Sequence, residues 1–213
     1  MLNLSPSVLI SRIVTLLIAL TLHDFSHAFV ADRFGDDTPR NAGRLTLNPL
    51  KHLDLIGSLM LILIGFGWAK PVPVNPWKLR SHSRSALMWV SLAGPGSNFL
   101  MAVLAAILLR TGFIPHTTTA SFLPTPSTFL LTFIVINLIL MLFNLIPVAP
   151  LDGEKILEYL LPEPLRSGFM KIQPYGPIIL LVLMFVLPRF GIDIISWVMN
   201  PALSGLSRLL IGG

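Results

Sequence analysis

Residues 8–30 read VLISRIVTLLIALTLHDFSHAFV, an apolar run that carries two histidines and an aspartate near its end. A run of this length is long enough to cross a bilayer as a helix. The whole chain has 213 residues, of which 54% are hydrophobic and 12% are charged, whereas about a quarter of the residues of a soluble domain are charged. This composition excludes an ordinary water-soluble domain and indicates an integral membrane protein.

Further apolar stretches follow the first one at residues 53–66, 86–109, 129–146, 177–187 and 192–211. The second and third of these are long enough for full spans, whereas the stretch at 53–66 is short and bounded by glycine. A short apolar stretch of this kind predicts a re-entrant segment or a β-hairpin. The last two stretches form either two short crossings or one crossing and a surface helix. We expect an all-α polytopic membrane protein.

Lysine and arginine are distributed unevenly among the connections between spans. Of the 15 in the chain, eight lie in residues 31–85, one in residues 110–128 and three in residues 147–173. Connections rich in positive charge stay in the cytoplasm, so this alternation predicts an N-terminus outside the cell. No basic run typical of nucleic-acid binding is present, and the absence of cysteine excludes disulfides, thiolate metal ligands and a cysteine nucleophile.

The end of the first span carries the side chains most suited to metal chemistry. Ionisable groups are costly inside a membrane, so His23, Asp24 and His27 are functional candidates. Positions four apart in a helix share one face, and two histidines at that spacing commonly offer two nitrogen ligands to zinc. Asp24 lies about 100° around the helix from His23, within reach of water at such a metal. The alternative is that the histidines are polar packing residues.

A catalytic zinc site usually has three protein ligands, and Asp152 is the best candidate for the third. It lies in FNLIPVAPLDG (143–153), where prolines and a glycine mark a break at the end of the third span. Irregular backbone at membrane depth is tolerated where it is buried in protein or lines a cavity. In the predicted topology the first and third spans both run inward, which places His23, His27 and Asp152 at cytoplasmic helix ends. Taken alone, Asp152 equally suits a turn or an N-cap.

Several segments follow one another in a characteristic order: HDFSHAFVADRFGD (23–36), GRLTLNPLKHLDLIGS (43–58), FGWAKPVPVNP (66–76), AGPGSN (93–98) and FNLIPVAPLDG (143–153). Together they resemble the site-2 protease family of intramembrane zinc metalloproteases, peptidase family M50, in its short form without a PDZ domain. In this comparison HDFSH stands for the family's HExxH helix. The resemblance covers residues 22–156, most of the chain.

The resemblance implies a single membrane metalloprotease domain over residues 1–213, with a three-helix core at about 8–156 and C-terminal helices at about 174–211. It implies one Zn²⁺ per chain, held by His23, His27 and Asp152, and hydrolysis of peptide bonds in transmembrane protein substrates. The expected location is a prokaryotic cell membrane, with several crossings and the active site toward the cytoplasm. The sequence is compatible with a homo-oligomer and with a separate regulatory partner.

Three further residues are expected to bind substrate, and a fourth is a similar candidate. By resemblance, Asn98 faces the active site and holds the substrate backbone or an oxyanion, and Gly94 allows close approach of helix or substrate. Asn144 in the third span is a similar candidate, as is Asn137. Helix packing and backbone hydrogen bonding are the alternative roles for these residues. His52 and Asp54 form a weak candidate for a second metal site, and a structured loop is the better interpretation of that segment.

One residue departs from the family pattern. The catalytic Glu of HExxH is here Asp24, which would act as the general base. Aspartate is one methylene shorter, and a misplacement of about 1 Å can cost roughly 10²-fold in rate. The sequence therefore also allows a catalytically weak or inactive relative that binds membrane proteins or metal. A small transporter or metal carrier is a third possibility, because His and Asp residues in spans also mark ion paths.

Overall fold

The computed structural model describes residues 5–54, 57, 70–114 and 122–212. Its elements in chain order are α1 (Pro6–Arg33), α2 (Thr38–Asn41), η1 (Pro49–Lys51), α4 (Pro76–His82), α5 (Ala86–Arg110), α6 (Pro126–Asn144), α7 (Asp152–Leu160), α8 (Leu165–Ile172), η2 (Gln173–Tyr175), α9 (Gly176–Leu181), η3 (Val182–Val186), η4 (Leu187–Phe190) and α10 (Ile194–Ile211).

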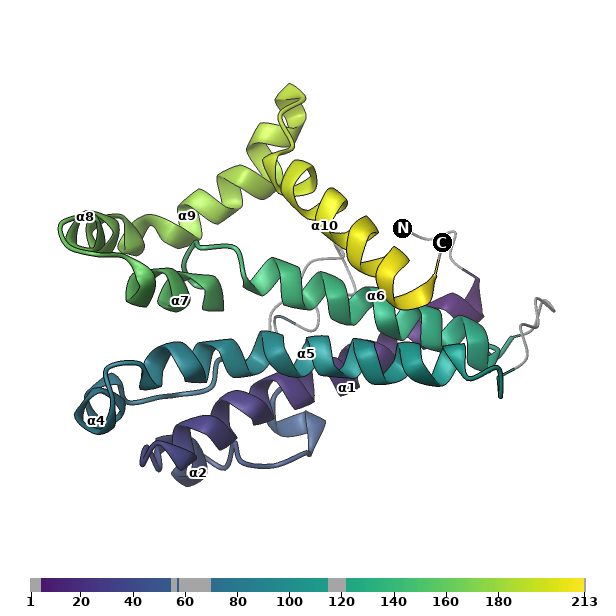
Figure 1. The fold of residues 1–213 in the computed structure, drawn as a ribbon, viewed down its shortest axis with the longest axis horizontal. Helices are drawn as coiled ribbons and strands as arrows, with labels where there is room; N and C mark the ends of the chain where they lie inside the picture. Colours follow the sequence, from purple (N-terminus) through teal and green to yellow (C-terminus); the bar gives the residue numbers. More distant parts are fainter. Residues whose placement is uncertain (1–4, 55–56, 58–69, 115–121, 213) are drawn as a thin grey trace.

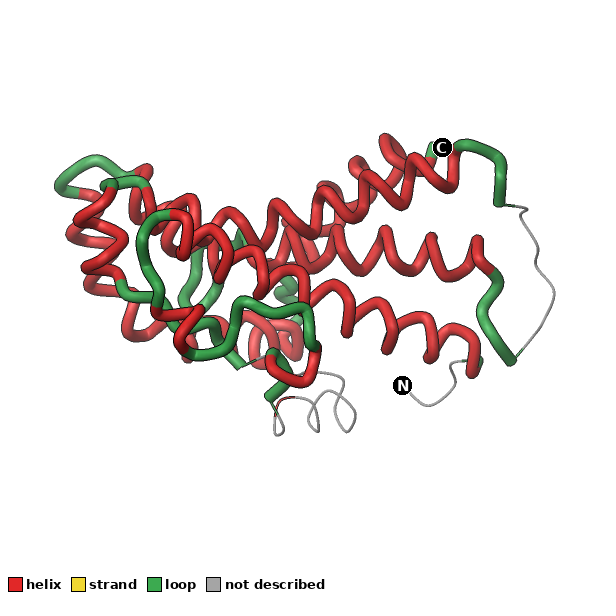
Figure 2. The backbone as a smooth tube through the Cα atoms, turned by 90° about the horizontal axis from the view of Figure 1, so that it is seen from below, coloured by secondary structure: helices red, strands yellow, loops and turns green. Residues whose placement is uncertain are grey.

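Three long helices form the centre of the molecule. Helices α1, α5 and α6 pack against one another, and α5 runs in the opposite direction to the other two (Figure 1). The end of α1 and the end of α6 therefore lie at the same end of the bundle as the start of α5. The short helices and most of the connecting loops gather at that end (Figure 2). The relative directions of α1, α5 and α6 are those that the sequence predicted for the three spans.

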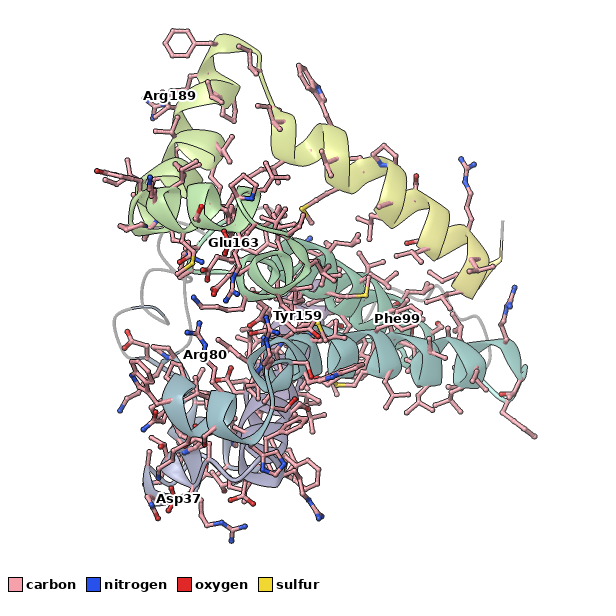
Figure 3. The ribbon with its side chains drawn as sticks, turned by 60° about the vertical axis from the view of Figure 1, so that its left-hand side comes forward. Asp37, Arg80, Phe99, Tyr159, Glu163 and Arg189 are labelled. Carbon is pink, nitrogen blue, oxygen red and sulfur yellow. The ribbon has the colours of Figure 1, made fainter. Side chains whose placement is uncertain are left out.

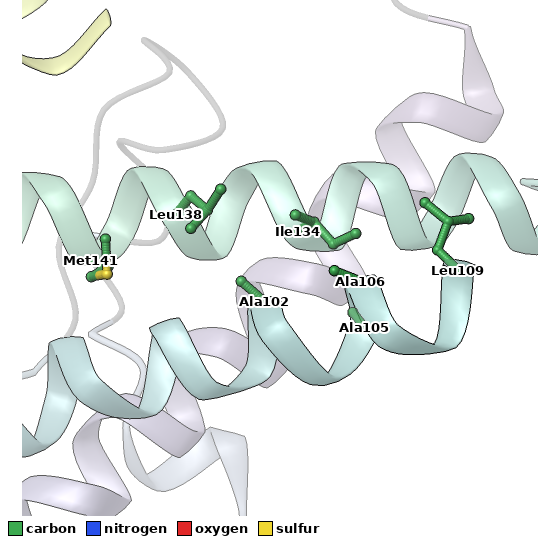
Figure 4. Packing of buried hydrophobic residues seen from close by; sticks show 7 residues of the cluster. All are labelled: Ala102, Ala105, Ala106, Leu109, Ile134, Leu138 and Met141. Carbon is green, nitrogen blue, oxygen red and sulfur yellow. The ribbon is translucent and has the colours of Figure 1, made fainter. Parts of the chain in front are cut away.

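The interface between α5 and α6 contains an apolar core. Its buried members, drawn in Figure 4, are Ala102, Ala105, Ala106 and Leu109 of α5 and Ile134, Leu138 and Met141 of α6. Small residues such as alanine let the two helix backbones approach closely, which is how helices commonly associate in a membrane. Leucines of α10, including Leu203 and Leu206, cover the outer side of this core. Because α10 has no buried residue of its own, most of its surface is left for lipid.

Within the described residues, five helical stretches are long and apolar enough to cross a membrane: Pro6–Arg33, Ala86–Arg110, Pro126–Asn144, Leu165–Phe190 and Ile194–Ile211. The prediction of an all-α polytopic membrane protein is confirmed. The third helix begins three residues earlier than the predicted 129, because the Thr125 hydroxyl accepts a hydrogen bond from the backbone N–H of Thr128 and Pro126 occupies the first turn. The re-entrant or β-hairpin segment predicted at 53–66 lies almost entirely outside the described residues.

The C-terminal region consists of two helical arms that meet at a sharp turn. The first arm contains α8 to η4, and α10 returns from the turn along α6 (Figure 1). Gly191 makes the turn possible, because it has a φ of 78°, a left-handed conformation that favours glycine. Both arms have the length and hydropathy of a membrane span. Each arm is therefore compatible with crossing the bilayer.

The connection between α1 and α5 is held together by two buried charged residues. The Arg44 guanidinium, 3% exposed, donates hydrogen bonds to the backbone carbonyls of Lys51, Lys70 and Pro71. The Asp36 carboxylate accepts from the backbone N–H groups of Thr38 and Asn75, which ties the end of α1 to the start of α4. These bonds fix the backbone that carries His52, the residue directly after η1.

Candidate metal centre

Helix α1 presents His23 and His27 on one buried face. Their side chains are packed edge to face, with ring centroids 4.6 Å apart, and their Nε2 atoms are separated by 3.0 Å. Both residues lie in the half of α1 that faces α5, where small residues such as Ala19 and Ala28 are also fully buried. The i, i+4 spacing read from the sequence therefore brings two imidazole nitrogens to one point.

Asp152 reaches the same point from the first residue of α7. Its Oδ2 atom lies 3.3 Å from the Nε2 atom of His23 and 3.3 Å from that of His27. Helix α7 packs on α5, and its start lies against the backbone just after α6. Gly153 makes this approach possible, because a Cβ there would lie 2.3 Å from the Leu145 carbonyl oxygen. The Asp-Gly pair thus serves the packing of α7 as well as the placement of the carboxylate.

The three donor atoms fit a tetrahedral zinc ion. They form a triangle with edges of 3.0, 3.3 and 3.3 Å. In a tetrahedral site with zinc–ligand bonds of about 2.0–2.1 Å, ligand atoms lie about 3.3–3.4 Å apart. Among the residues that the structure describes, His23, His27 and Asp152 form a group whose ligand atoms lie close enough together to share one metal ion. Two histidines and a carboxylate leave a fourth position free, as catalytic zinc sites require.

The hydrogen bonds of the histidines set which nitrogen faces the centre. The Nδ1 atom of His27 lies 2.7 Å from the Val90 carbonyl oxygen, and a carbonyl only accepts, so the proton is on Nδ1. The Nδ1 atom of His23 lies 2.6 Å from Oδ1 of Asn98. Both Nε2 lone pairs then point toward Asp152, whose Oδ2 is buried and has no hydrogen-bond donor in the part of the chain that the structure describes. Three lone pairs that converge in this way are the arrangement that a cation stabilises.

Gly94 of α5 closes one side of the centre. A Cβ at this position would lie 2.3 Å from Nε2 of His27 and 2.6 Å from Nε2 of His23. Real side chains essentially never approach so closely, so only glycine leaves these nitrogens in place. The predicted contribution of Gly94 to substrate binding is not tested by this geometry, which instead places the residue directly against the two histidines.

Asp24 is buried beside the centre, and it contacts a residue that the sequence did not single out for this role. Its Oδ2 atom lies 3.4 Å from Nδ1 of His52. His52 is 1% exposed, and its Nε2 donates a 2.8 Å hydrogen bond to the Thr46 carbonyl oxygen. The neighbouring Asp54 turns away and accepts a hydrogen bond from the backbone N–H of Gly57. His52 and Asp54 thus make different hydrogen bonds within this loop, and their side chains do not face the same partner.

The two asparagines predicted to bind substrate occupy different environments. Asn98 is fully buried in α5, between His23 and Asn137. Asn144 ends α6 and is half-buried, and its amide donates to the Leu140 carbonyl oxygen one turn earlier. The substrate-binding role of both residues stays a prediction. For Asn144, the backbone hydrogen bond that was considered as an alternative is present.

A buried carboxylate holds α7, and with it Asp152, against its neighbours. Glu158 accepts hydrogen bonds from Arg80 of α4, Arg166 of α8 and Gln173 of η2. Figure 3 labels Arg80 and Tyr159, the residue after Glu158. Burial acts to raise the pKa of Glu158, but the hydrogen bonds from Gln173 and Arg166 and the charges of Lys155 and Arg80 outweigh it and lower the pKa. This cluster could not be read from the sequence, because its members are far apart in the chain.

Comparisons with known proteins identify the family of the chain. The profile of peptidase family M50 matches residues 113–187, which include Asp152. The protein named "Putative zinc metalloprotease YwhC" of Bacillus subtilis (strain 168) is 43% identical over 180 residues, 83% of this chain and 80% of that protein. The proteins named "Putative zinc metalloprotease Rip2" are 34% identical over 206 residues in Mycolicibacterium smegmatis and 33% identical over 205 residues in Mycobacterium tuberculosis (strain ATCC 25618 / H37Rv).

The two Rip2 matches cover 92% and 91% of this chain, and 74% of each relative. No solved structure matches the chain. The matches to YwhC and Rip2 extend over most of the sequence. The chain belongs to peptidase family M50, the site-2 protease family of membrane zinc metalloproteases.

Proposed function

We propose that this protein hydrolyses peptide bonds of transmembrane proteins at a single zinc site formed by His23, His27 and Asp152. The observation that supports the proposal most strongly is the triangle of donor atoms, with edges of 3.0, 3.3 and 3.3 Å, buried at the shared end of α1 and α6. Zinc bound there supplies Lewis-acid activation of water and of the scissile carbonyl. The remaining chemistry belongs to the side chains around it.

Asp24 is the proposed general base and acid. Its carboxylate takes a proton from the attacking water and delivers it to the amine nitrogen of the leaving peptide. Its Oδ2 is buried and has no hydrogen-bond donor within the described residues, so a lone pair is available for this proton. In the family pattern a glutamate holds this position, so Asp24 has to act with a side chain that is one methylene shorter.

The presence of Asp24 in place of the family's glutamate also leads to a second candidate function. If Asp24 does not reach the attacking water, the chain is a weak or inactive relative that binds membrane proteins or metal. The two functions share the metal site and differ in turnover. We propose the protease as the function, because both the donor triangle and the buried carboxylate beside it are present.

We further propose that the N-terminus lies outside the cell and that the metal centre faces the cytoplasm of a prokaryotic cell. The bundle end that carries the centre also carries the two connections rich in Lys and Arg, whereas residues 110–128 at the other end contain only Arg110. Cysteine substitution and labelling with an impermeant reagent should place Ser85 inside and Thr119 outside. Labelling of both positions from one side would contradict this orientation.

The metal site is tested by metal analysis of the purified protein. The unmodified chain should hold one zinc per chain, and His23→Ala, His27→Ala and Asp152→Asn should each lower zinc affinity sharply, because a three-ligand site rarely survives the loss of one ligand. His82→Ala is the matched control, since His82 is an exposed histidine at the end of α4 that packs on Phe34. Stoichiometric zinc in Asp152→Asn would mean that the third ligand is assigned wrongly.

A further inference from the structure

A continuous hydrogen-bonded path runs from α6 through α5 to His23 on α1. The amide nitrogen of Asn137 donates to the Phe133 carbonyl oxygen (2.9 Å), and its Oδ1 accepts from the amide of Asn98 (2.9 Å). The Oδ1 atom of Asn98 in turn lies 2.6 Å from Nδ1 of His23. Both asparagines are completely buried. The path thus begins at a backbone carbonyl and ends at a proposed zinc ligand.

The path has a direction, because its first member can only accept. A backbone carbonyl has no proton to give, so Asn137 must present its NH₂ group to Phe133 and its oxygen to Asn98. Asn98 must then present its NH₂ group to Asn137 and its oxygen to His23. An oxygen acceptor requires the proton of His23 on Nδ1, which leaves the Nε2 lone pair free for a metal.

His27 does not need such a path. Its Nδ1 atom is paired with the Val90 carbonyl oxygen, which belongs to a helix backbone and cannot turn over. The acceptor for His23 is a side-chain amide, and an amide that rotates by 180° exchanges its acceptor for a donor. A rotated Asn98 would donate to Nδ1, would move the proton of His23 to Nε2, and would block the ligand atom.

We propose that Asn137 is a positioning residue of the metal centre, which fixes the orientation of Asn98 and thereby keeps His23 in the tautomer that binds zinc. This inference rests on the proposed metal site, but it concerns a residue that is not one of the three ligands and reaches His23 only through Asn98. Outer partners of ligand histidines typically change metal affinity by about 10–100-fold when they are removed.

The chain offers a matched control on the same helix. Asn144 also donates its amide to the carbonyl oxygen one turn earlier, that of Leu140, at the same distance of 2.9 Å. Among the described residues its side chain makes no hydrogen bond to α5. Asn137→Leu and Asn144→Leu therefore remove the same local bond, and only the first breaks the path. The two variants are compared by zinc affinity and by histidine tautomer.

Asn137→Asp is the conservative variant. A buried neutral carboxyl group reproduces both bonds, since its hydroxyl donates to Phe133 and its other oxygen accepts from Asn98. A carboxylate also accepts from Asn98, so either form keeps the orientation of that amide. We expect Asn137→Asp to retain the zinc affinity that Asn137→Leu loses.

The experiment measures the tautomer of His23 directly in metal-free protein. Nitrogen NMR of ¹⁵N-histidine-labelled protein in bilayers, with the His23 signals identified by their loss in His23→Ala, should show the proton on Nδ1 in the unmodified chain and in Asn137→Asp. Asn137→Leu should populate the Nε2-protonated form and bind zinc at least tenfold more weakly in chelator competition, whereas Asn144→Leu should match the unmodified chain.

An Nε2-protonated His23 in the unmodified metal-free protein would overturn the proposal. This measurement does not depend on whether Asn137→Leu folds. Unchanged tautomer and zinc affinity in a folded Asn137→Leu would overturn it as well. A wrong assignment of the metal site would give a different result, because zinc would then remain stoichiometric in His27→Ala. The tautomer of His23 would still show whether Asn137 fixes the orientation of Asn98.

Discussion

The Nδ1 atom of His52 lies 3.4 Å from the Oδ2 atom of Asp24, and both residues are buried. The other ring nitrogen of His52 is held by the Thr46 carbonyl oxygen, so the ring cannot turn away from the carboxylate without losing that bond. His52 thus packs against the aspartate that stands where the family has glutamate. A fixed neighbour of this kind limits the positions that the shorter side chain can adopt.

Replacement of His52 should therefore slow catalysis without removing the metal. In His52→Leu we expect kcat to fall by about 10- to 100-fold, the range that a displacement of about 1 Å produces, with zinc content and KM unchanged. The assay is cleavage of a transmembrane substrate in detergent or bilayers, and His82→Leu is the control for loss of a histidine. Loss of zinc in His52→Leu would show that the residue supports the metal site instead.

Gly94→Ala should disrupt the metal site. A Cβ at this position would lie 2.3 Å from Nε2 of His27, so the helices must separate or the histidines must move. We expect zinc affinity to fall by at least tenfold. Gly96→Ala is the matched control two residues later in α5, where a Cβ meets nothing within 4 Å and alanine favours the helix by about 0.5–1 kcal/mol. Equal zinc affinities in the two variants would contradict the packing described here.

Gly153→Ala should displace Asp152 by moving α7. A Cβ here would lie 2.3 Å from the Leu145 carbonyl oxygen, and this obstacle is backbone that cannot rotate away. We expect a loss of about 1–3 kcal/mol of stability, the usual cost of overpacking, together with weaker zinc binding. The comparison is Gly168→Ala in α8, where the added Cβ meets nothing within 4 Å. Thermal unfolding and zinc titration of both variants measure the two effects.

The Glu158 cluster should make stability depend on pH in a defined direction. The pKa of Glu158 is lowered in the folded protein, so its stabilising contribution is present above the unfolded pKa of about 4.3. The contribution is lost as the pH falls through the lower folded value. Glu158→Gln should thus lower Tm at pH 7, and the difference from the unmodified chain should shrink below about pH 4. Glu163→Gln, at an exposed glutamate beyond α7, should show no such pattern.

Much of the bundle could be predicted from the sequence, because a membrane span is a strong and local signal. Long apolar runs reveal α1, α5 and α6, and the i, i+4 spacing of His23 and His27 reveals a shared face. Asp152 could be proposed because a carboxylate follows a proline-rich break. The charge pattern predicts the direction of the spans relative to one another, which the structure shows, while the side of the membrane stays a prediction.

Contacts between distant segments could not be predicted in the same way. His52 lies on a loop without helical or strand periodicity, so its sequence neighbours do not show which residue it faces. Asn137 reads as one polar residue among several in an apolar helix, and its partner Asn98 is on another span. Glu158 is part of an ordinary charged helix in the sequence, and its burial depends on how α4, α7 and α8 pack.

The most direct test of the proposed function compares Asp24 with Asp24→Glu and Asp24→Asn at full zinc occupancy. Cleavage of transmembrane substrates that contain helix-breaking residues is measured for all three. The account predicts cleavage by the unmodified chain, equal or faster cleavage by Asp24→Glu, which extends the carboxylate by one methylene, and a loss of about 10²- to 10⁴-fold in Asp24→Asn, which keeps the shape without the base. Full zinc occupancy with no cleavage by either the aspartate or the glutamate form would contradict the protease function.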